Sequence, residues 1–203
     1  MNNYDKVAED SKRNFILWDQ EEIIARTKVK ADARYIYLNF CDSPYRVNRK
    51  TGSVQCLANI ASPYEARYNE VMGIFDFLCN SRAGAAPAGR WVTPAALTHY
   101  VGSDSGGSLF PQEAKFFDEN SQGLSQVIQK YHSFSAGDVS CILPVFDSLS
   151  TVFQFWRSDD EFPPSIKFLW DADTSSFFHF ETAMFTQAYW VEKLINTIKA
   201  NIR

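Results

Sequence analysis

The sequence lacks an excess of positive charge. Its 203 residues include 20 Lys and Arg against 24 Asp and Glu, which gives a formal net charge of −4 and a pI of about 5.4. Proteins that bind nucleic acids or anionic membrane surfaces present a strongly basic face. The composition therefore argues against a nucleic-acid partner and against a membrane-surface partner.

Long apolar runs and a leader pattern are also missing. No run approaches the ~18 apolar residues needed to cross a bilayer. The first fifteen residues, MNNYDKVAEDSKRNF, lack the basic segment and apolar core of a signal peptide. We therefore expect a cytoplasmic protein without a membrane-spanning segment.

Paired cysteines are absent as well. Cys41, Cys56, Cys79 and Cys141 contain no C-x-x-C pair, which disfavours an iron–sulfur cluster or a zinc ribbon. We expect reduced, mostly buried thiols and assign no metal ligand. No residue pattern identifies a cofactor.

Aromatic residues are what the sequence has in abundance, with 17 Phe, 9 Tyr and 5 Trp. Aromatic side chains bury the most area per residue, so most of them are expected in a core. Apolar residues make up 45% and charged residues 22%, which is typical of a folded chain. The length fits a single domain over residues 1–203.

The first part of the chain predicts two helices followed by strands. A helix is expected over 3–17, and Asp19 with Glu22 forms a capping box for a short second helix. Residues 1–30 would thus be a helical N-terminal extension. The β-branched and aromatic runs of 34–58, separated by turns, predict a three-stranded antiparallel meander.

The clearest helical pattern begins at Ser62. Ser62 is the expected N-cap, Pro63 the first helical residue and Glu65 the acid at the third position. An apolar stripe follows at helical spacing and consists of Tyr64, Tyr68, Val71, Phe75 and Leu78. The segment AGAAPAG at 83–89 is a loop and the best candidate for an internal hinge.

The second half predicts helices and strands in turn. Helices should begin near Pro94, Pro111 and Ser121, and strands should cover 139–144, 151–157 and 165–170. A last helix over 180–199 should bury one stripe formed by Phe180, Met184, Ala188, Val191, Ile195 and Ile198. This order predicts an α+β fold, a mainly antiparallel sheet with helices packed on it, whose core spans 31–200.

The densest acidic cluster is Asp159, Asp160 and Glu161, in a proline-rich turn between two strands. Three adjacent carboxylates repel one another, so an exposed turn that caps backbone N–H groups is one interpretation. Ligand or hard-cation binding is a second. Acid–base catalysis with a raised pKa is a third.

Asp171 and Asp173 form a second acidic cluster at the other end of the same hairpin. Six strand residues place it roughly 20 Å from the first cluster, so the two are treated as separate sites. Asp171 is expected to cap the turn into the last helix or to bind a ligand together with His179. For His179 itself, a buried, hydrogen-bonded side chain competes with a catalytic base.

Two further features of the sequence are candidate binding elements. Trp91, Trp156 and Trp170 form part of the core, or line a pocket for a flat organic ligand if they are partly exposed. The GSDSGG loop at 102–107 lacks the lysine and threonine of a phosphate-binding P-loop, which favours a plain flexible loop.

Several ordered motifs in the chain resemble a known family. They are G-R-W-V at 89–92, G-D-V-S at 137–140, L-P at 143–144, F-W-R-S-D-D-E-F-P-P at 155–164 and F-L-W-D-A-D at 168–173. This set resembles a prokaryotic family called domain of unknown function 3786, found largely in anaerobes, over roughly 30–195. The resemblance implies no catalytic residue. Some relatives are fused to a domain binding a four-iron cluster, which implies a setting in anaerobic redox or one-carbon metabolism, although this chain lacks the cysteine quartet.

Two functions follow from these observations. The first is a non-catalytic accessory module that binds a small molecule or a partner protein, with Asp159, Asp160, Glu161, Trp91 and Trp156 as ligand-binding candidates. The alternative is a divalent-metal-dependent or acid–base enzyme that uses the three carboxylates. The enzyme requires at least two of them to converge in a concave pocket.

Overall fold

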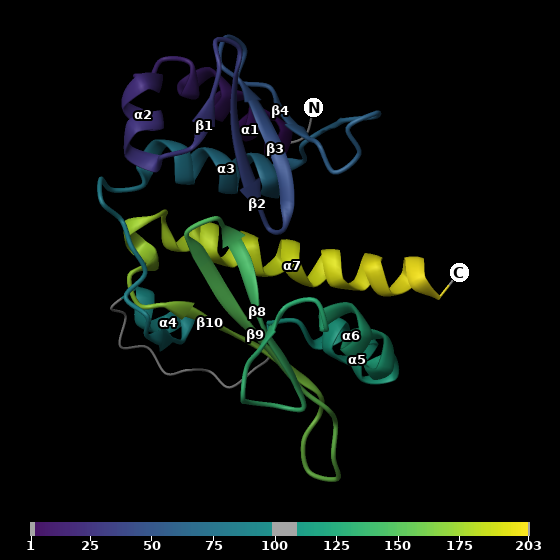
Figure 1. The fold of residues 1–203 in the computed structure, drawn as a ribbon. Coiled ribbons are helices and arrows are strands. Elements are labelled where there is room, and N and C mark those ends of the chain that lie inside the picture. The colour runs from purple at the N-terminus through teal and green to yellow at the C-terminus, as the bar shows by residue number, and fades with distance from the viewer. Residues whose placement is uncertain (1–2, 99–108, 203) are drawn as a thin grey trace.

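The structure is a computed structural model that describes residues 3–98 and 109–202. Two antiparallel sheets, one in each half of the chain, lie on opposite sides of the long C-terminal helix α7 (Phe180–Asn201), as Figure 1 shows. The predicted α+β class is confirmed, although the strands are divided between two sheets rather than joined in one. The expected GSDSGG loop lies outside the described residues.

The first sheet has the strand order β1-β2-β3-β4-β5. Its strands are β1 (Lys30–Ala31), β2 (Tyr35–Phe40), β3 (Ser43–Asn48), β4 (Val54–Cys56) and β5 (Tyr64–Glu65). The predicted meander is confirmed as β2, β3 and β4, and the two short strands extend it at its edges. Alternate residues Ile36, Leu38 and Phe40 are buried, as expected for a sheet with one covered face.

Three helices cover this sheet: α1 (Asn3–Phe15), α2 (Gln20–Thr27) and α3 (Tyr68–Asn80). The Asp19 side chain caps α2 as predicted, since its Oδ1 accepts from the backbone N–H groups of Glu21 and Glu22 at 3.0 and 3.1 Å. Phe15 and Ile23 are fully buried, so both N-terminal helices contribute side chains to the core.

The predicted start of α3 at Ser62 is wrong. Tyr64 and Glu65 pair with β4 instead, and the Glu65 carboxylate accepts a 2.7 Å hydrogen bond from Gln55 Nε2. The helix begins at Tyr68 and its third residue is Glu70, which accepts a hydrogen bond from the Arg67 N–H at 2.6 Å. Sheet pairing therefore outcompeted the local capping signal. The later part of the predicted stripe, Val71, Phe75 and Leu78, is buried as expected.

The second sheet has the order β6-β10-β9-β8-β7. Its strands are β6 (Trp91–Val92), β7 (His132–Ser133), β8 (Val139–Phe146), β9 (Leu149–Trp156) and β10 (Ser165–Asp171). The predicted hairpin of β9 and β10 is confirmed, with Trp156 opposite Ser165 and Thr151 opposite Trp170. Strand β8 continues past Pro144, where the expected strand ended, because a register shift at Pro144 accommodates the missing N–H.

Shorter helices complete the second half: α4 (Pro94–Leu97), α5 (Pro111–Glu119), α6 (Ser121–Ile128) and the 3₁₀ turn η1 (Thr174–Ser176). The three predicted helix starts are confirmed. The two halves meet where the β2–β3 turn reaches the end of β8, since the Cys41 N–H donates to the Val145 carbonyl at 2.9 Å and Asn39 Nδ2 donates to Asp147 Oδ1 at 2.8 Å.

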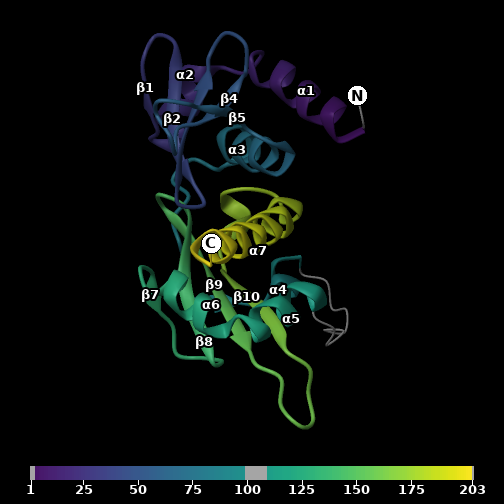
Figure 2. The ribbon, with the colours of Figure 1, turned by 90° about the vertical axis from the view of Figure 1, so that its right-hand side faces the viewer.

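Helix α7 packs on both halves of the protein. Figure 2 shows it nearly end-on, with α3 above it and the second sheet below. The predicted stripe is wrong in most of its members, because only Val191 and Ile198 of it are buried. The buried residues instead include Ala183, Trp190 and Leu194 together with the polar Thr182, Thr186 and Gln187. A helix buried on two sides has no single apolar stripe, which explains the error. No described helix is long and apolar enough to span a bilayer.

Candidate functional site

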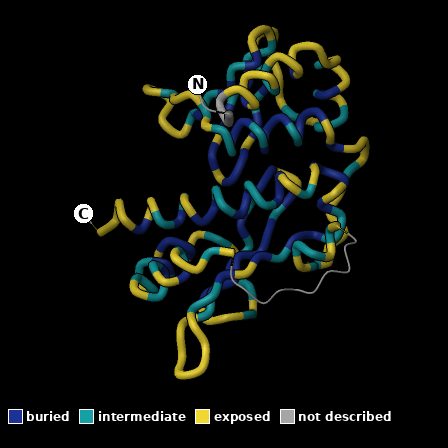
Figure 3. The backbone as a smooth tube through the Cα atoms, turned by 180° about the vertical axis from the view of Figure 1, so that it is seen from behind, coloured by how far each residue is buried: buried dark blue, intermediate teal, exposed yellow. Residues whose placement is uncertain are grey.

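The carboxylates Asp159, Asp160 and Glu161 lie exposed at the tip of the β9–β10 hairpin, the yellow loop at the bottom of Figure 3. Asp159 Oδ1 accepts from the N–H groups of Glu161 and Phe162 at 2.9 and 2.7 Å. These two hydrogen bonds lower the pKa of Asp159 below its usual range. Asp159 thus stabilises its own turn, and the cluster stands on a convex surface.

Asp171 occupies the other end of the hairpin and is only 3% exposed. Its Oδ1 accepts from the N–H groups of Ala88 and Asp173 at 2.7 and 2.9 Å, and its Oδ2 accepts from the Gly89 N–H at 2.8 Å. The carboxylate therefore fastens the loop of residues 83–89 to the end of β10. Asp171 and Asp173 are in contact through the Asp173 N–H, but the length of the hairpin separates both from Asp159.

His179 is paired with Asp76 of α3. The His179 Nδ1 lies 2.7 Å from Asp76 Oδ1, and Asp76 Oδ2 accepts from the His179 N–H at 2.8 Å and from Thr182 Oγ1 at 2.5 Å. The side chain of His179 is 65% exposed, so the expectation of a buried histidine is wrong. This arrangement anchors the first turn of α7 to α3.

The tryptophan candidates Trp91 and Trp156 are both half-buried. Trp91 lies opposite Asp171 at one end of β10, whereas Trp156 lies opposite Ser165 at the other end. The strand therefore holds them apart, and they do not share one pocket. Trp170, between them in the sheet, is fully buried and packs edge-to-face on Phe178 with ring centroids 5.8 Å apart.

Asp171 and Asp160 are expected to differ sharply in their effect on stability. Asp171→Ala leaves three backbone N–H groups without their acceptor and should lower the free energy of unfolding by about 2–4 kcal/mol. Asp160→Ala, at the exposed tip, should change it by less than about 0.5 kcal/mol. Urea denaturation followed by circular dichroism measures both. Equal effects of the two substitutions would contradict this placement of the carboxylates.

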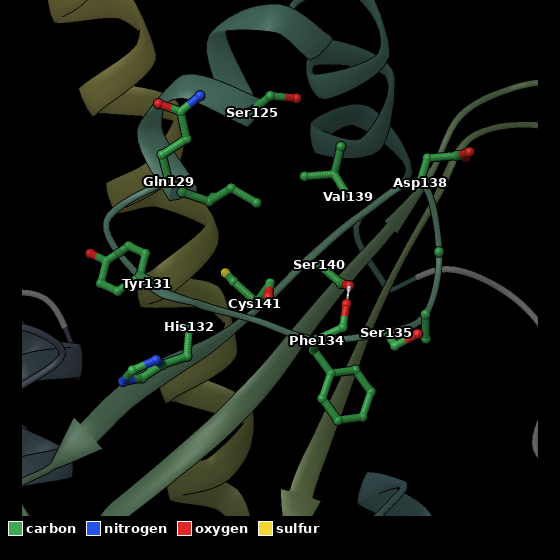
Figure 4. Close-up of a pocket in the computed structure, with 14 residues that line it drawn as sticks. Ser125, Gln129, Tyr131, His132, Phe134, Ser135, Asp138, Val139, Ser140 and Cys141 are labelled. Atoms are coloured by element: carbon green, nitrogen blue, oxygen red, sulfur yellow. Dashed lines mark hydrogen bonds between the residues drawn. The ribbon is translucent and has the colours of Figure 1, made fainter.

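A cavity of about 690 Å³ lies against β7 and β8 (Figure 4). It contains His132 and Cys141, but the His132 ring points away from the Cys141 sulfur in Figure 4. Burial raises the pKa of Cys141 to about 12, so its thiol stays protonated. The Ser140 hydroxyl donates a hydrogen bond to the Phe134 carbonyl. This cavity accordingly offers no paired nucleophile and base.

A larger cavity, of about 970 Å³, lies between the two halves. β5 and α3 form one wall of it, and α7 forms the other. The side chains that matter for its chemistry are Tyr64, Tyr68, Glu70, Phe185, Tyr189 and Lys193. Its volume is at the upper end of the range found for small-molecule sites.

Glu70 is the unusual residue of this cavity, since it is charged and only 1% exposed. Its Oε1 accepts hydrogen bonds from the hydroxyls of Tyr64 at 2.8 Å, Tyr189 at 3.3 Å and Tyr45. Its Oε2 accepts from the Arg67 N–H at 2.6 Å. Among the described residues, no basic side chain forms an ion pair with Glu70. Hydroxyl and amide donors alone therefore stabilise a buried carboxylate.

The tyrosines around Glu70 remain protonated. Burial is the largest cause that raises the pKa of Tyr45, Tyr64 and Tyr189 well above the usual range, and the neighbouring Glu70 carboxylate adds to it. The hydroxyls of Tyr45 and Tyr189 also lie 3.1 Å from each other. The cluster is thus a network of hydrogen-bond donors around one acceptor, drawn from β3, β5, α3 and α7.

Lys193 is the partly buried cation of the cavity, whereas the other cation in its lining, Arg67, is exposed and lies 3.5 Å from Glu192. Its Nζ donates to the Cys41 carbonyl at 2.5 Å and to the Ser43 hydroxyl at 2.7 Å. Burial lowers the pKa of Lys193. The lysine therefore reaches from α7 to the β2–β3 turn of the other half.

That turn is held in a strained conformation. Cys41 and Asp42 have φ values of 48° and 61°, the left-handed region that two-residue hairpin turns require and that Asn and Gly usually occupy. Asp42 Oδ2 accepts from Lys130 Nζ at 2.6 Å and from the Tyr131 hydroxyl at 2.9 Å. Strained residues that their surroundings hold in place cluster at functional sites, and this turn borders the cavity.

The sequence predicted no functional role for Glu70, Tyr45, Tyr189 or Lys193. One signal for Glu70 was present, namely an acid three residues after the true N-cap, Arg67. Tyr45 and Tyr189 are separated by 144 residues, and no local pattern links them. Among the residues that the structure describes, no three His, Cys, Asp or Glu side chains are grouped to hold a metal ion.

Comparisons with known proteins identify the family alone. No curated protein matches the chain, and no solved structure matches it. A family model described as domain of unknown function (DUF3786) matches residues 19–193, a span that includes both sheets, most of the residues that line the larger cavity and all the motifs that carry the resemblance. The chain therefore belongs to this family of unknown function.

Proposed function

We propose that this protein is a non-catalytic module that binds a small molecule in the cavity between its two halves. The observation that carries the proposal is Glu70, a carboxylate 1% exposed in the wall of a cavity of about 970 Å³. A buried charge without an ion-pair partner costs several kcal/mol in general. Such groups are concentrated at binding and active sites.

The aromatic lining supports a small organic ligand. Tyr68 of the first half and Phe185 of α7 meet edge-to-face, with ring centroids 5.8 Å apart. Ligand pockets typically combine aromatic walls with a few fixed polar groups. Here Tyr189 and Lys193 of α7 supply the polar groups, and the buried Glu70 holds the Tyr189 hydroxyl in place by a 3.3 Å hydrogen bond.

The chemistry of the cavity argues against catalysis. A general base needs a pKa near the working pH, but the tyrosine hydroxyls have raised pKa values. Burial also keeps the Cys41 thiol protonated, since its pKa is raised well above the usual value. The alternative enzyme based on Asp159, Asp160 and Glu161 lacks the concave pocket it requires.

We place this module in the cytoplasm. All four cysteines are free and buried, which suits a reducing compartment. A role in anaerobic redox or one-carbon metabolism stays a prediction of the family resemblance alone. The alternative occupant is a partner protein, and a screen in which no small compound stabilises the wild type would favour it.

A cavity-filling variant tests the proposal. Asn196 is an exposed α7 residue that lines the cavity, and Asn196→Trp places an indole in its mouth. A ligand at about a hundred times its Kd stabilises the folded chain by about 2.7 kcal/mol, which raises the Tm of a domain of this size by roughly 5–10 °C. Thermal-shift screening of small organic compounds should find such ligands for the wild type and not for Asn196→Trp.

Asn201→Trp is the matched control, since Asn201 is exposed near the end of the same helix. It should respond to every compound that stabilises the wild type. The proposal fails if no compound stabilises the wild type, or if Asn196→Trp responds as strongly as Asn201→Trp.

A further inference from the structure

Lys193 brings a positive charge to the lining of the cavity, and its Nζ also lies 5.3 Å from the centroid of the Trp190 ring. An ammonium carries three N–H donors, and Lys193 gives two of them to neutral oxygens, the Cys41 carbonyl and the Ser43 hydroxyl. Within the described part of the chain, no ion pair includes Lys193. Its positive charge, partly removed from water, is therefore not neutralised by a directly bonded carboxylate.

The carboxylates around this lysine have other partners. Asp42 binds Lys130 and Tyr131. Glu192 lies 3.5 Å from Arg67 at the rim. Glu70 is occupied by three hydroxyls and one backbone N–H. An anionic group bound in the cavity would therefore meet no competing carboxylate at Lys193, and pairing favours a cation that is partly removed from water.

The cavity wall on α7 changes from apolar to charged along the helix. Phe185, Tyr189 and Lys193 follow one another at four-residue intervals, which places them on one face of a helix. At 1.5 Å per residue, Phe185 and Lys193 are about 12 Å apart along the axis. Tyr68 closes the apolar end against Phe185. A ligand would thus meet aromatic rings at one end and an ammonium at the other.

We infer that the cavity binds an organic anion, with its apolar, ring-sized body beside Tyr68 and Phe185 and a carboxylate or phosphate group on Lys193 Nζ. This inference rests on the small-molecule binding proposed above and adds the charge and the orientation of the ligand. The ligand's anionic oxygen accepts the third N–H of Lys193, while Cys41 and Ser43 keep the ammonium in position. A charge-assisted contact of this kind is about twice as strong as a neutral one.

The test uses pairs of probes that differ only in charge. Arylalkanoic acids and aryl phosphates are titrated into the full-length protein beside the matching carboxamides, and binding is followed by NMR chemical shifts and calorimetry. The wild type should bind the anions roughly tenfold to a hundredfold more tightly than the amides. The anion class that binds more tightly shows whether the cavity prefers a carboxylate or a phosphate.

Three lysine variants locate the effect. Lys193→Met keeps the apolar stem and removes the charge, and Lys193→Gln also keeps an N–H donor for the Cys41 carbonyl if the methionine variant unfolds. Either variant should bind anions and amides equally. Lys199→Met changes an exposed lysine of the same helix, whose Nζ lies over the Phe116 ring, and should keep the wild-type preference.

The outcomes separate the two proposals. The wild type could bind anions and amides equally, and Asn196→Trp could abolish both. This result would support small-molecule binding and overturn the inference that the ligand is an anion. An anion preference that survives in both Lys193 variants would overturn the role of Lys193. Binding of neither class by the wild type would overturn both proposals.

Discussion

Replacing Glu70 by alanine is expected to lower the free energy of unfolding by about 3–5 kcal/mol. The substitution removes the common acceptor of the Tyr45, Tyr64 and Tyr189 hydroxyls and of the Arg67 N–H. The Tyr45 hydroxyl is buried and loses its acceptor without replacement, and the part-buried donors of Tyr189, Tyr64 and Arg67 lose theirs as well. Urea denaturation of the purified variant measures the loss.

Two further variants show whether the network is the cause. Glu192→Ala changes an exposed carboxylate at the rim of the same cavity and should cost less than about 0.5 kcal/mol. The double variant Glu70→Ala/Tyr45→Phe should lose less free energy of unfolding than the sum of the two single variants. Glu70→Ala already leaves the Tyr45 hydroxyl without its acceptor, so removing that hydroxyl as well costs little more. A strictly additive pair, or a Glu70→Ala variant as stable as the wild type, would contradict the network.

Above about pH 10 the free energy of unfolding should fall steeply. The pKa values of Tyr45 and Tyr189 are raised above the usual value of 10.0, mainly by burial. The folded state keeps these protons while the unfolded chain releases them, so the stabilisation is fully present below pH 10 and is lost above it. Each tyrosine contributes a slope of about 1.4 kcal/mol per pH unit.

Other buried groups modify this profile in known directions. Burial raises the pKa of Cys79 and Cys141 from 9.0 to about 12, so their contribution begins to be lost already above pH 9. Lys193 acts in the opposite sense, because its pKa is lowered and the unfolded chain holds the extra proton. One lysine opposes several tyrosines and cysteines, and the net change with rising pH is therefore a loss of stability.

Urea unfolding at steps between about pH 8 and about pH 11 measures the profile, and Tyr45→Phe identifies its origin. Above pH 10 the free energy of unfolding of Tyr45→Phe should fall with pH less steeply than that of the wild type, by about 1.4 kcal/mol per pH unit. Between pH 9 and pH 10 the two proteins should show the same slope. A free energy of unfolding that stays constant above pH 10 would contradict protonated, buried tyrosines in the cluster.

Local sequence signals were reliable where a few neighbouring residues decide the structure. Asp19 and Asp159 each accept hydrogen bonds from N–H groups two and three residues later. Capping was the prediction for Asp19 and one of three interpretations for Asp159. The strand β2 and the proline-rich turn after β9 were predicted for the same reason. Turn chemistry and strand period depend on short stretches of chain.

The predictions failed where distant segments compete for the same residues. Ser62, Pro63 and Glu65 fit a helix start, but hydrogen bonds to β4 draw Tyr64 and Glu65 into a strand. In α7 the periodicity predicted one buried stripe, whereas packing on both halves buries a different set of positions. Intrinsic preference is a weak guide against such tertiary contacts.

By itself the sequence determined the α+β class, the hairpin of β9 and β10, the separation of Asp159 from Asp171 and the family to which the chain belongs. These features rest on periodicity, turn residues and ordered motifs within short stretches. Only the tertiary structure decided the candidate site. Glu70 meets Tyr189 across 119 residues of chain and Lys193 meets Cys41 across 152. The burial of these charges depends on the packing of α7 between the two halves rather than on neighbouring residues.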